Sequence, residues 1–94
     1  MEPLSTNEWQ AIDSAHHMAP FTDYADLRKK GARIITCAKG HCVYDSDGNR
    51  ILDGMAGLWC VNVGYGRREL VEAASSQMAE LPYYNNFFKT SNPP

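Results

Sequence analysis

The segment 54–66 constrains this chain more than any other feature, because it combines frequent glycines with large apolar residues. It holds four of the seven glycines of the chain, and apolar side chains such as Leu58 and Trp59 stand between them. The segment follows neither helical nor strand periodicity. Apolar residues interrupted by glycines predict an irregular backbone that packs closely against another surface.

Regular helices are predicted on both sides of this segment. Ser5 and Glu8 have the spacing of a capping box, which predicts a helix over 5–17. A further one or two helical turns are expected over 24–30, before a glycine. After the glycine-rich segment, apolar residues at helical spacing predict an amphipathic helix over 67–81, which a proline ends.

Three short strands are predicted between the second helix and the glycine-rich segment. The β-branched and aromatic residues of 33–37, 41–45 and 50–53 favour extended backbone. Residues 38–40 are a candidate tight turn, and the Asp-Gly pair within 46–49 is a stronger one. The sequence therefore predicts an α+β chain with an N-terminal helix, a three-stranded antiparallel meander and an amphipathic helix.

Composition excludes several classes of protein. A chain of 94 residues fits one domain at most, and its formal charge of −2 argues against a nucleic-acid binder. The longest uncharged stretch, 54–66, is too short for a membrane span of about 20 residues. The N-terminus has no basic stretch followed by an apolar run, so we expect a cytoplasmic protein without a membrane or nucleic-acid partner.

The residues that carry chemistry are sparse. Three cysteines without an export signal are expected to be reduced thiols: Cys37, Cys42 and Cys60. His41 lies between two of them, but this is not the paired spacing of a zinc site and no fourth ligand is evident. Residues 64–69 begin like a phosphate loop but lack its third glycine. We therefore predict no catalytic, metal-binding or cofactor-binding residue in the chain.

Two features of the C-terminal third point to missing contacts. Residues 83–88 hold four of the ten aromatic residues, and their burial represents on the order of 6–12 kcal/mol. Residues 91–94 resemble a helix start with no helix after it. We expect the N-terminal piece of a larger protein, or a module that needs a partner. The alternative is a small complete domain that buries these side chains in its own core.

Four segments in this order and spacing resemble one family. They are 16–23, 44–49, 52–66 and 81–88, and together they are similar to the N-terminus of class III, pyridoxal-phosphate-dependent aminotransferases, in the omega-transaminase branch. The resemblance implies fold type I, with a large α/β domain that holds the cofactor and a small domain built from both chain ends. Residues 1–94 then correspond to a small-domain segment and the start of the large domain, without the cofactor-binding domain.

The resemblance also implies a substrate pocket. Leu58 and Trp59 match positions that line it, Phe87 and Phe88 match aromatics that complete a pocket, in many members from the neighbouring subunit, and Phe21 matches an aromatic at the entrance. Apolar walls suit an amine with an apolar body, and an aromatic face attracts a distal ammonium. The implied partners are a small-molecule amine, a 2-oxo acid and a second copy of the complete protein.

Pyridoxal phosphate is the cofactor that the resemblance implies for the complete enzyme. None of Lys29, Lys30, Lys39 and Lys89 lies in the family's lysine motif, so we expect this chain alone neither to bind the cofactor nor to transfer amino groups from an amine, polyamine or omega-amino acid to pyruvate or another 2-oxo acid. Two alternatives stay open: a stand-alone binding or interaction module, and the N-terminus of another class III enzyme.

Overall fold

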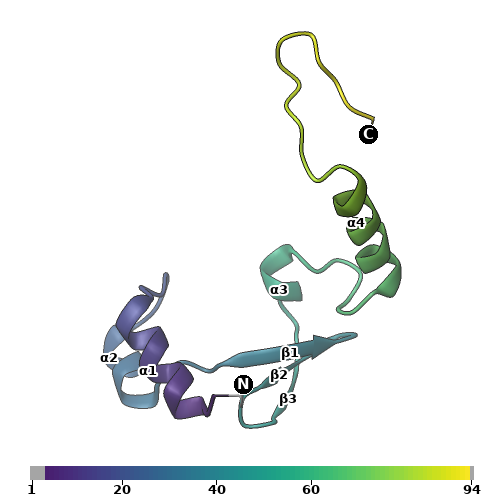
Figure 1. Ribbon diagram of the computed structural model, residues 1–94. Coiled ribbons are helices and arrows are strands. Elements are labelled where there is room, and N and C mark those ends of the chain that lie inside the picture. Colours follow the sequence, from purple (N-terminus) through teal and green to yellow (C-terminus); the bar gives the residue numbers. More distant parts are fainter. Residues whose placement is uncertain (1–3, 94) are drawn as a thin grey trace.

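The computed structural model describes residues 4–93 as seven short elements along an extended path (Figure 1). In chain order these are α1 (Thr6–His16), α2 (Tyr24–Lys30), β1 (Ile35–Lys39), β2 (Cys42–Asp45), β3 (Arg50–Leu52), α3 (Ala56–Trp59) and α4 (Arg68–Glu80). The radius of gyration is 18.4 Å, whereas a compact chain of this length has about 12 Å. Of the helices described between residues 4 and 93, none is long and apolar enough to cross a membrane.

The three strands form the predicted antiparallel meander, in the order β1-β2-β3. The first strand, β1, begins and ends two residues later than the predicted strand 33–37. The predicted turn at 38–40 is therefore also placed too early in the sequence. Lys39 pairs with Cys42, so only two residues close the turn. The pairing partner in β2 decides where β1 ends, and strand propensity alone does not carry that information.

The two N-terminal helices begin where the sequence predicts. The capping box of α1 is present: the Ser5 amide donates to Glu8 Oε2 at 2.8 Å, and Ser5 Oγ accepts from the Glu8 amide at 3.4 Å. Asp23 caps α2 by accepting from the Ala25 amide at 2.8 Å, and α2 ends at Gly31. Both starts depend on bonds between near neighbours in sequence, which is why they could be predicted.

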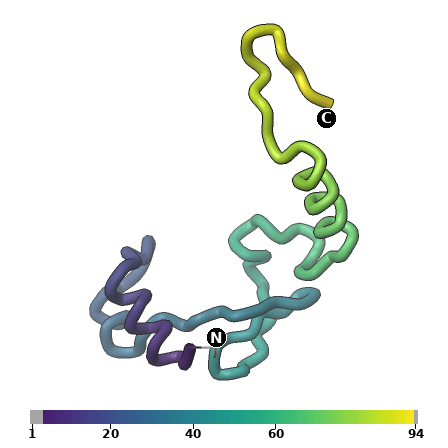
Figure 2. The backbone as a smooth tube through the Cα atoms, viewed as in Figure 1, coloured from purple at the N-terminus to yellow at the C-terminus, as the bar shows by residue number. Residues whose placement is uncertain are grey.

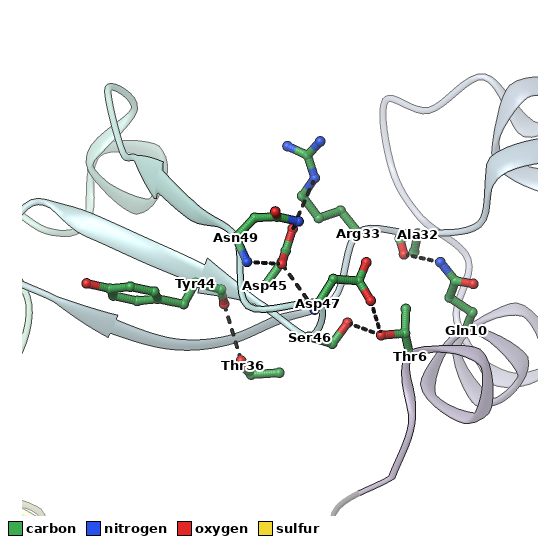
Figure 3. A network of polar contacts seen from close by, with 10 residues as sticks. All are labelled: Thr6, Gln10, Ala32, Arg33, Thr36, Tyr44, Asp45, Ser46, Asp47 and Asn49. Carbon is green, nitrogen blue, oxygen red and sulfur yellow. Dashed lines mark hydrogen bonds and ion pairs between the residues drawn. The ribbon is translucent and has the colours of Figure 1, made fainter.

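Polar contacts join α1 to the turn between β2 and β3 (Figure 3). Thr6 Oγ1 lies 2.8 Å from Ser46 Oγ and 2.7 Å from Asp47 Oδ1. Gln10 Nε2 donates to the carbonyl oxygen of Ala32 at 2.9 Å. These side chains fix the helix beside the hairpin without any apolar core between them.

The described residues form no hydrophobic core. Within 4–93, Cys42 and Asp45 are the only buried residues. α4 forms as predicted, but its apolar face is uncovered and both Leu70 and Met78 are exposed. Figure 2 shows α4 and the segment after it leading away from the sheet. The expected surplus of apolar surface is therefore confirmed, and the arrangement is not that of a small domain with its own core.

Candidate functional site

The turn that carries Leu58 and Trp59 has a left-handed backbone. Its four residues, Ala56 to Trp59, have φ values of 52°, 58°, 60° and 69° in sequence order. Only one of them, Gly57, adopts this conformation without steric cost, and each of the others costs about 1–2 kcal/mol. The irregular backbone predicted for 54–66 is confirmed here, and surrounding bonds must hold the strained turn in place.

The Asp53 carboxylate supplies three of those bonds. Its Oδ1 accepts from the Met55 amide at 3.0 Å, and its Oδ2 accepts from the Gly57 amide at 2.8 Å and from the Tyr65 hydroxyl at 2.5 Å. The hydrogen bond from Tyr65, with help from the two amides, lowers the pKa of Asp53 below its ordinary value. The same bond to the carboxylate raises the pKa of Tyr65. The pair is therefore an ionised carboxylate with a neutral phenol.

Backbone bonds complete the turn on its other side. The Trp59 amide donates to the Met55 carbonyl at 3.1 Å, and the amides of Cys60 and Val61 both donate to the Ala56 carbonyl, at 2.9 and 2.8 Å. Hydrogen bonds thus hold the backbone on both sides of the turn, while the side chains of Leu58 and Trp59 stay exposed. Trp59 is 88% exposed and Leu58 is 65% exposed.

The aromatic pair Phe87–Phe88 stands on a second irregular turn. The two rings meet edge to face with centroids 6.2 Å apart and an interplanar angle of 70°. Phe88 and Lys89 have φ values of 56° and 66°. Thr90 Oγ1 lies 2.5 Å from the Phe87 carbonyl oxygen and 3.0 Å from that of Asn85. Local hydrogen bonds from Thr90 therefore hold this turn, and both phenyl rings are exposed.

Phe21 lies in the connection between α1 and α2, and it too has a positive φ, of 51°. Thr22 Oγ1 donates to the Pro20 carbonyl at 2.8 Å, and the Tyr24 hydroxyl donates to the Ala19 carbonyl at 2.8 Å. These two bonds tie the connection on either side of the aromatic residue. The Phe21 ring itself is fully exposed.

The structure brings the predicted pocket residues together in pairs but not as one site. Leu58 adjoins Trp59 and Phe87 contacts Phe88, whereas α3, the α1–α2 connection and the C-terminal segment occupy separate parts of the molecule (Figure 1). One observation nevertheless links them. Six non-glycine residues of the described chain have positive φ, and four of these are predicted pocket residues. Strained backbone of this kind clusters at functional sites, so the pocket roles stay a prediction with physical support.

Sequence reasoning missed the two residues that organise the α3 turn. Asp53 precedes a glycine, and aspartate in such a position often bonds to backbone amides two residues on, so a search for that pattern would have found it. No local pattern identifies Tyr65, because its partner Asp53 lies 12 positions earlier in the chain.

Three observations on the described residues bear on cofactor and metal binding. All four lysines are exposed. A cavity of about 390 Å³ between α1 and the β2–β3 turn is lined by Lys30, Arg33 and Asp45 among others, and it contains none of the predicted pocket residues. Within 4–93, no group of three potential metal-ligating side chains lies close together.

Comparison with known proteins defines the class. The family model for class III aminotransferases matches residues 24–93. A putrescine–pyruvate aminotransferase from Pseudomonas aeruginosa is 66% identical over 89 residues, which are 95% of this chain and 20% of that relative. The chain therefore belongs to the class III aminotransferases, as its sequence motifs predict.

Solved structures agree with this assignment. The crystal structure of a thermostable (S)-enantioselective omega-transaminase from Thermomicrobium roseum matches with a TM-score of 0.86 and 43% identity, over 99% of this chain and 21% of that one. An omega-transaminase from Pseudomonas jessenii in complex with PMP matches with a TM-score of 0.81 and 31% identity, over 89% and 18%. The predicted α+β fold is confirmed, and the chain spans about a fifth of the length of these relatives.

Proposed function

We propose that this chain acts as part of a complete aminotransferase that moves an amino group from putrescine, or a closely related amine, to pyruvate. The observation that carries the proposal is the 66% identity to a putrescine–pyruvate aminotransferase over 95% of the chain. The net reaction converts one primary amine of the diamine to an aldehyde and converts pyruvate to alanine.

The chemistry of a diamine matches the side chains on the α3 turn. A diamine has an apolar body between two ammonium groups. While the amine at one end reacts, the ammonium group at the other end needs a binding site in the pocket. An indole face attracts an ammonium group by cation–π contact, and Leu58 adds apolar surface next to it. In this proposal Trp59 and Leu58 form a wall of the amine pocket and exclude water from it.

The remaining predicted pocket residues complete the site from other parts of a homodimer. Phe87 and Phe88 close the pocket of the neighbouring subunit, and Phe21 lines its entrance. Two observations support this role: the three rings are exposed, and Phe21 and Phe88 have positive φ. Exposed aromatic side chains on strained turns are suited to contact another surface. Residues 1–94 then belong to the small domain and the start of the large domain.

Pyridoxal phosphate is the proposed cofactor, and it supplies the electron sink for the reaction when it is bound. None of the four lysines of this chain lies in the lysine motif that the family resemblance implies. The residues that hold the cofactor are therefore assigned to the rest of the complete enzyme, and this chain contributes contacts to the substrate.

The proposal is tested with the complete protein, loaded with pyridoxal phosphate. Alanine formation is measured from pyruvate with putrescine, with a monoamine of similar length and with an omega-amino acid, and 2-oxoglutarate replaces pyruvate in a parallel series. We expect the highest kcat/KM with putrescine and pyruvate. No amino transfer from any donor to either acceptor would refute the proposal, and a preference for 2-oxoglutarate would refute the acceptor.

A further inference from the structure

We infer that Asp53 and Tyr65 are positioning residues that set the place of Trp59 in the amine pocket, an inference that rests on the function proposed above. Neither residue is expected to touch the substrate. Their hydrogen bonds fix the position of the strained α3 turn relative to the sheet. The position of the turn in turn fixes the position of the Trp59 indole ring.

The Asp53 carboxylate acts on the backbone at the start of the turn. It accepts from the amides of Met55 and Gly57, the two residues that flank Ala56, where the left-handed backbone begins. Both carboxylate oxygens are acceptors in this arrangement. An asparagine would set its amide group, which is a donor, against a donor on one side. The site therefore requires a carboxylate and not only a polar side chain.

Tyr65 links this carboxylate to the sheet. Its hydroxyl donates to Asp53, and its backbone makes two hydrogen bonds with Gly40 in the β1–β2 turn: the Tyr65 amide donates at 2.8 Å and the Tyr65 carbonyl accepts at 3.1 Å. The described chain thus contains a continuous path from the meander through Tyr65 and Asp53 to the turn that carries Trp59.

The Tyr65 hydroxyl also packs against the turn itself. A Cβ atom added at Gly57 would lie 3.1 Å from that hydroxyl and 2.9 Å from Val61 Cγ2. The turn is therefore restrained by contact as well as by hydrogen bonds. A displacement of about 1 Å in a substrate contact can lower kcat/KM by as much as about 100-fold, so small shifts of this turn matter.

The test uses Tyr65→Phe, Asp53→Asn and the double variant in the complete protein. Tyr44→Phe is the matched control, because it removes a phenol hydroxyl from β2 that makes no hydrogen bond to residues 53–65 in the described chain. Two quantities are measured: amide hydrogen exchange in the segment 53–65, and kcat and KM for putrescine with pyruvate.

We expect faster exchange in 53–65 for both single variants and a KM for putrescine raised about tenfold, with kcat changed by less than about twofold. The double variant should be little worse than either single one, because both remove the same link. Tyr44→Phe should match the unmodified protein. Unchanged exchange, unchanged kcat/KM or fully additive effects would each overturn the inference.

The outcomes also separate this inference from the proposed function. If the unmodified protein transfers no amino group from any amine, the proposed function fails, and with it the proposed contact between Trp59 and the substrate. The exchange measurement still decides whether Asp53 and Tyr65 hold the turn. If the unmodified protein is active and the variants behave like the control, the function stands and the inference fails.

Discussion

Strand β3 has an aspartate-organised turn at each end, and the two turns serve different purposes. Asp45 precedes β3 and accepts from the amides of Asp47 and Asn49, at 3.1 and 2.8 Å, and from Asn49 Nδ2 at 3.0 Å. It is buried, and its hydrogen bonds stay within one hairpin, with one ion pair outside it, to Arg33 Nε at 4.0 Å. Asp53 follows β3, and its bonds hold a left-handed turn that displays apolar side chains.

The difference between the turns lies in what each carboxylate stabilises. The hairpin at Asp45 has ordinary backbone with a glycine at its one position of positive φ, so its geometry costs little. The turn at Asp53 has three non-glycine residues in the left-handed region and exposes Trp59. An aspartate that accepts from backbone amides thus stabilises a hairpin in one place and a turn that exposes a predicted pocket residue in the other.

Trp59→Ala is expected to have the largest effect. If the indole is the proposed pocket wall, its burial against substrate is worth about 1.5–3 kcal/mol, so removing it should lower kcat/KM for putrescine about 100-fold. Steady-state kinetics of the complete protein measure this. A variant with kcat/KM close to the unmodified value would mean that Trp59 does not contact the amine.

Exchanging the glycine of each turn compares the two regions directly. Gly57→Ala forces a methyl group against Val61 and Tyr65, so we expect kcat/KM for putrescine to fall about 30-fold. Gly48 also has a positive φ, of 84°, but it has open space around it. Gly48→Ala should therefore cost about 1–2 kcal/mol of stability and leave kcat/KM unchanged. Equal kinetic effects in the two variants would contradict the distinction.

Asp45→Ala should affect stability and not activity. The variant leaves the amides of Asp47 and Asn49 without their acceptor, so the midpoint of thermal inactivation should fall by about 3 °C. kcat/KM for putrescine should stay within about twofold of the unmodified value, because the hairpin carries no predicted pocket residue. A large loss of kcat/KM at unchanged stability would be the opposite result.

The smallest expected effect concerns pH. Because hydrogen bonds lower the pKa of Asp53 in the folded state, its contribution to stability is present above the unfolded pKa, near 3.8, and is lost as the pH falls through the folded value. Denaturant unfolding of the unmodified protein and of Asp53→Asn should therefore differ near pH 6 and converge in acid. A difference that grows as the pH falls would contradict the assigned charge state.

The parts of the fold that could be predicted from sequence are those set by neighbouring residues. The capping box at Ser5 and Glu8 and the Asp-Gly turn before β3 follow local rules. The end of β1 could not be placed, because its pairing with β2 sets it.

The conformation of the candidate site could be predicted from sequence even less than the strand ends. Family resemblance identifies Leu58 and Trp59, but no local rule places these residues at positive φ. Their conformation depends on Asp53 together with Tyr65, which lies 12 positions away in sequence. Convergence of Phe21 and Phe87 on one pocket depends on surfaces outside the described residues, so it stays a prediction.

A crystal structure of the complete protein with its cofactor and a bound diamine tests the central claim most directly. The account predicts that the left-handed turn persists, with Asp53 bonded to Tyr65, and that the Trp59 indole lies within about 4 Å of the diamine. A diamine bound elsewhere, with Trp59 turned away from it, would contradict the account.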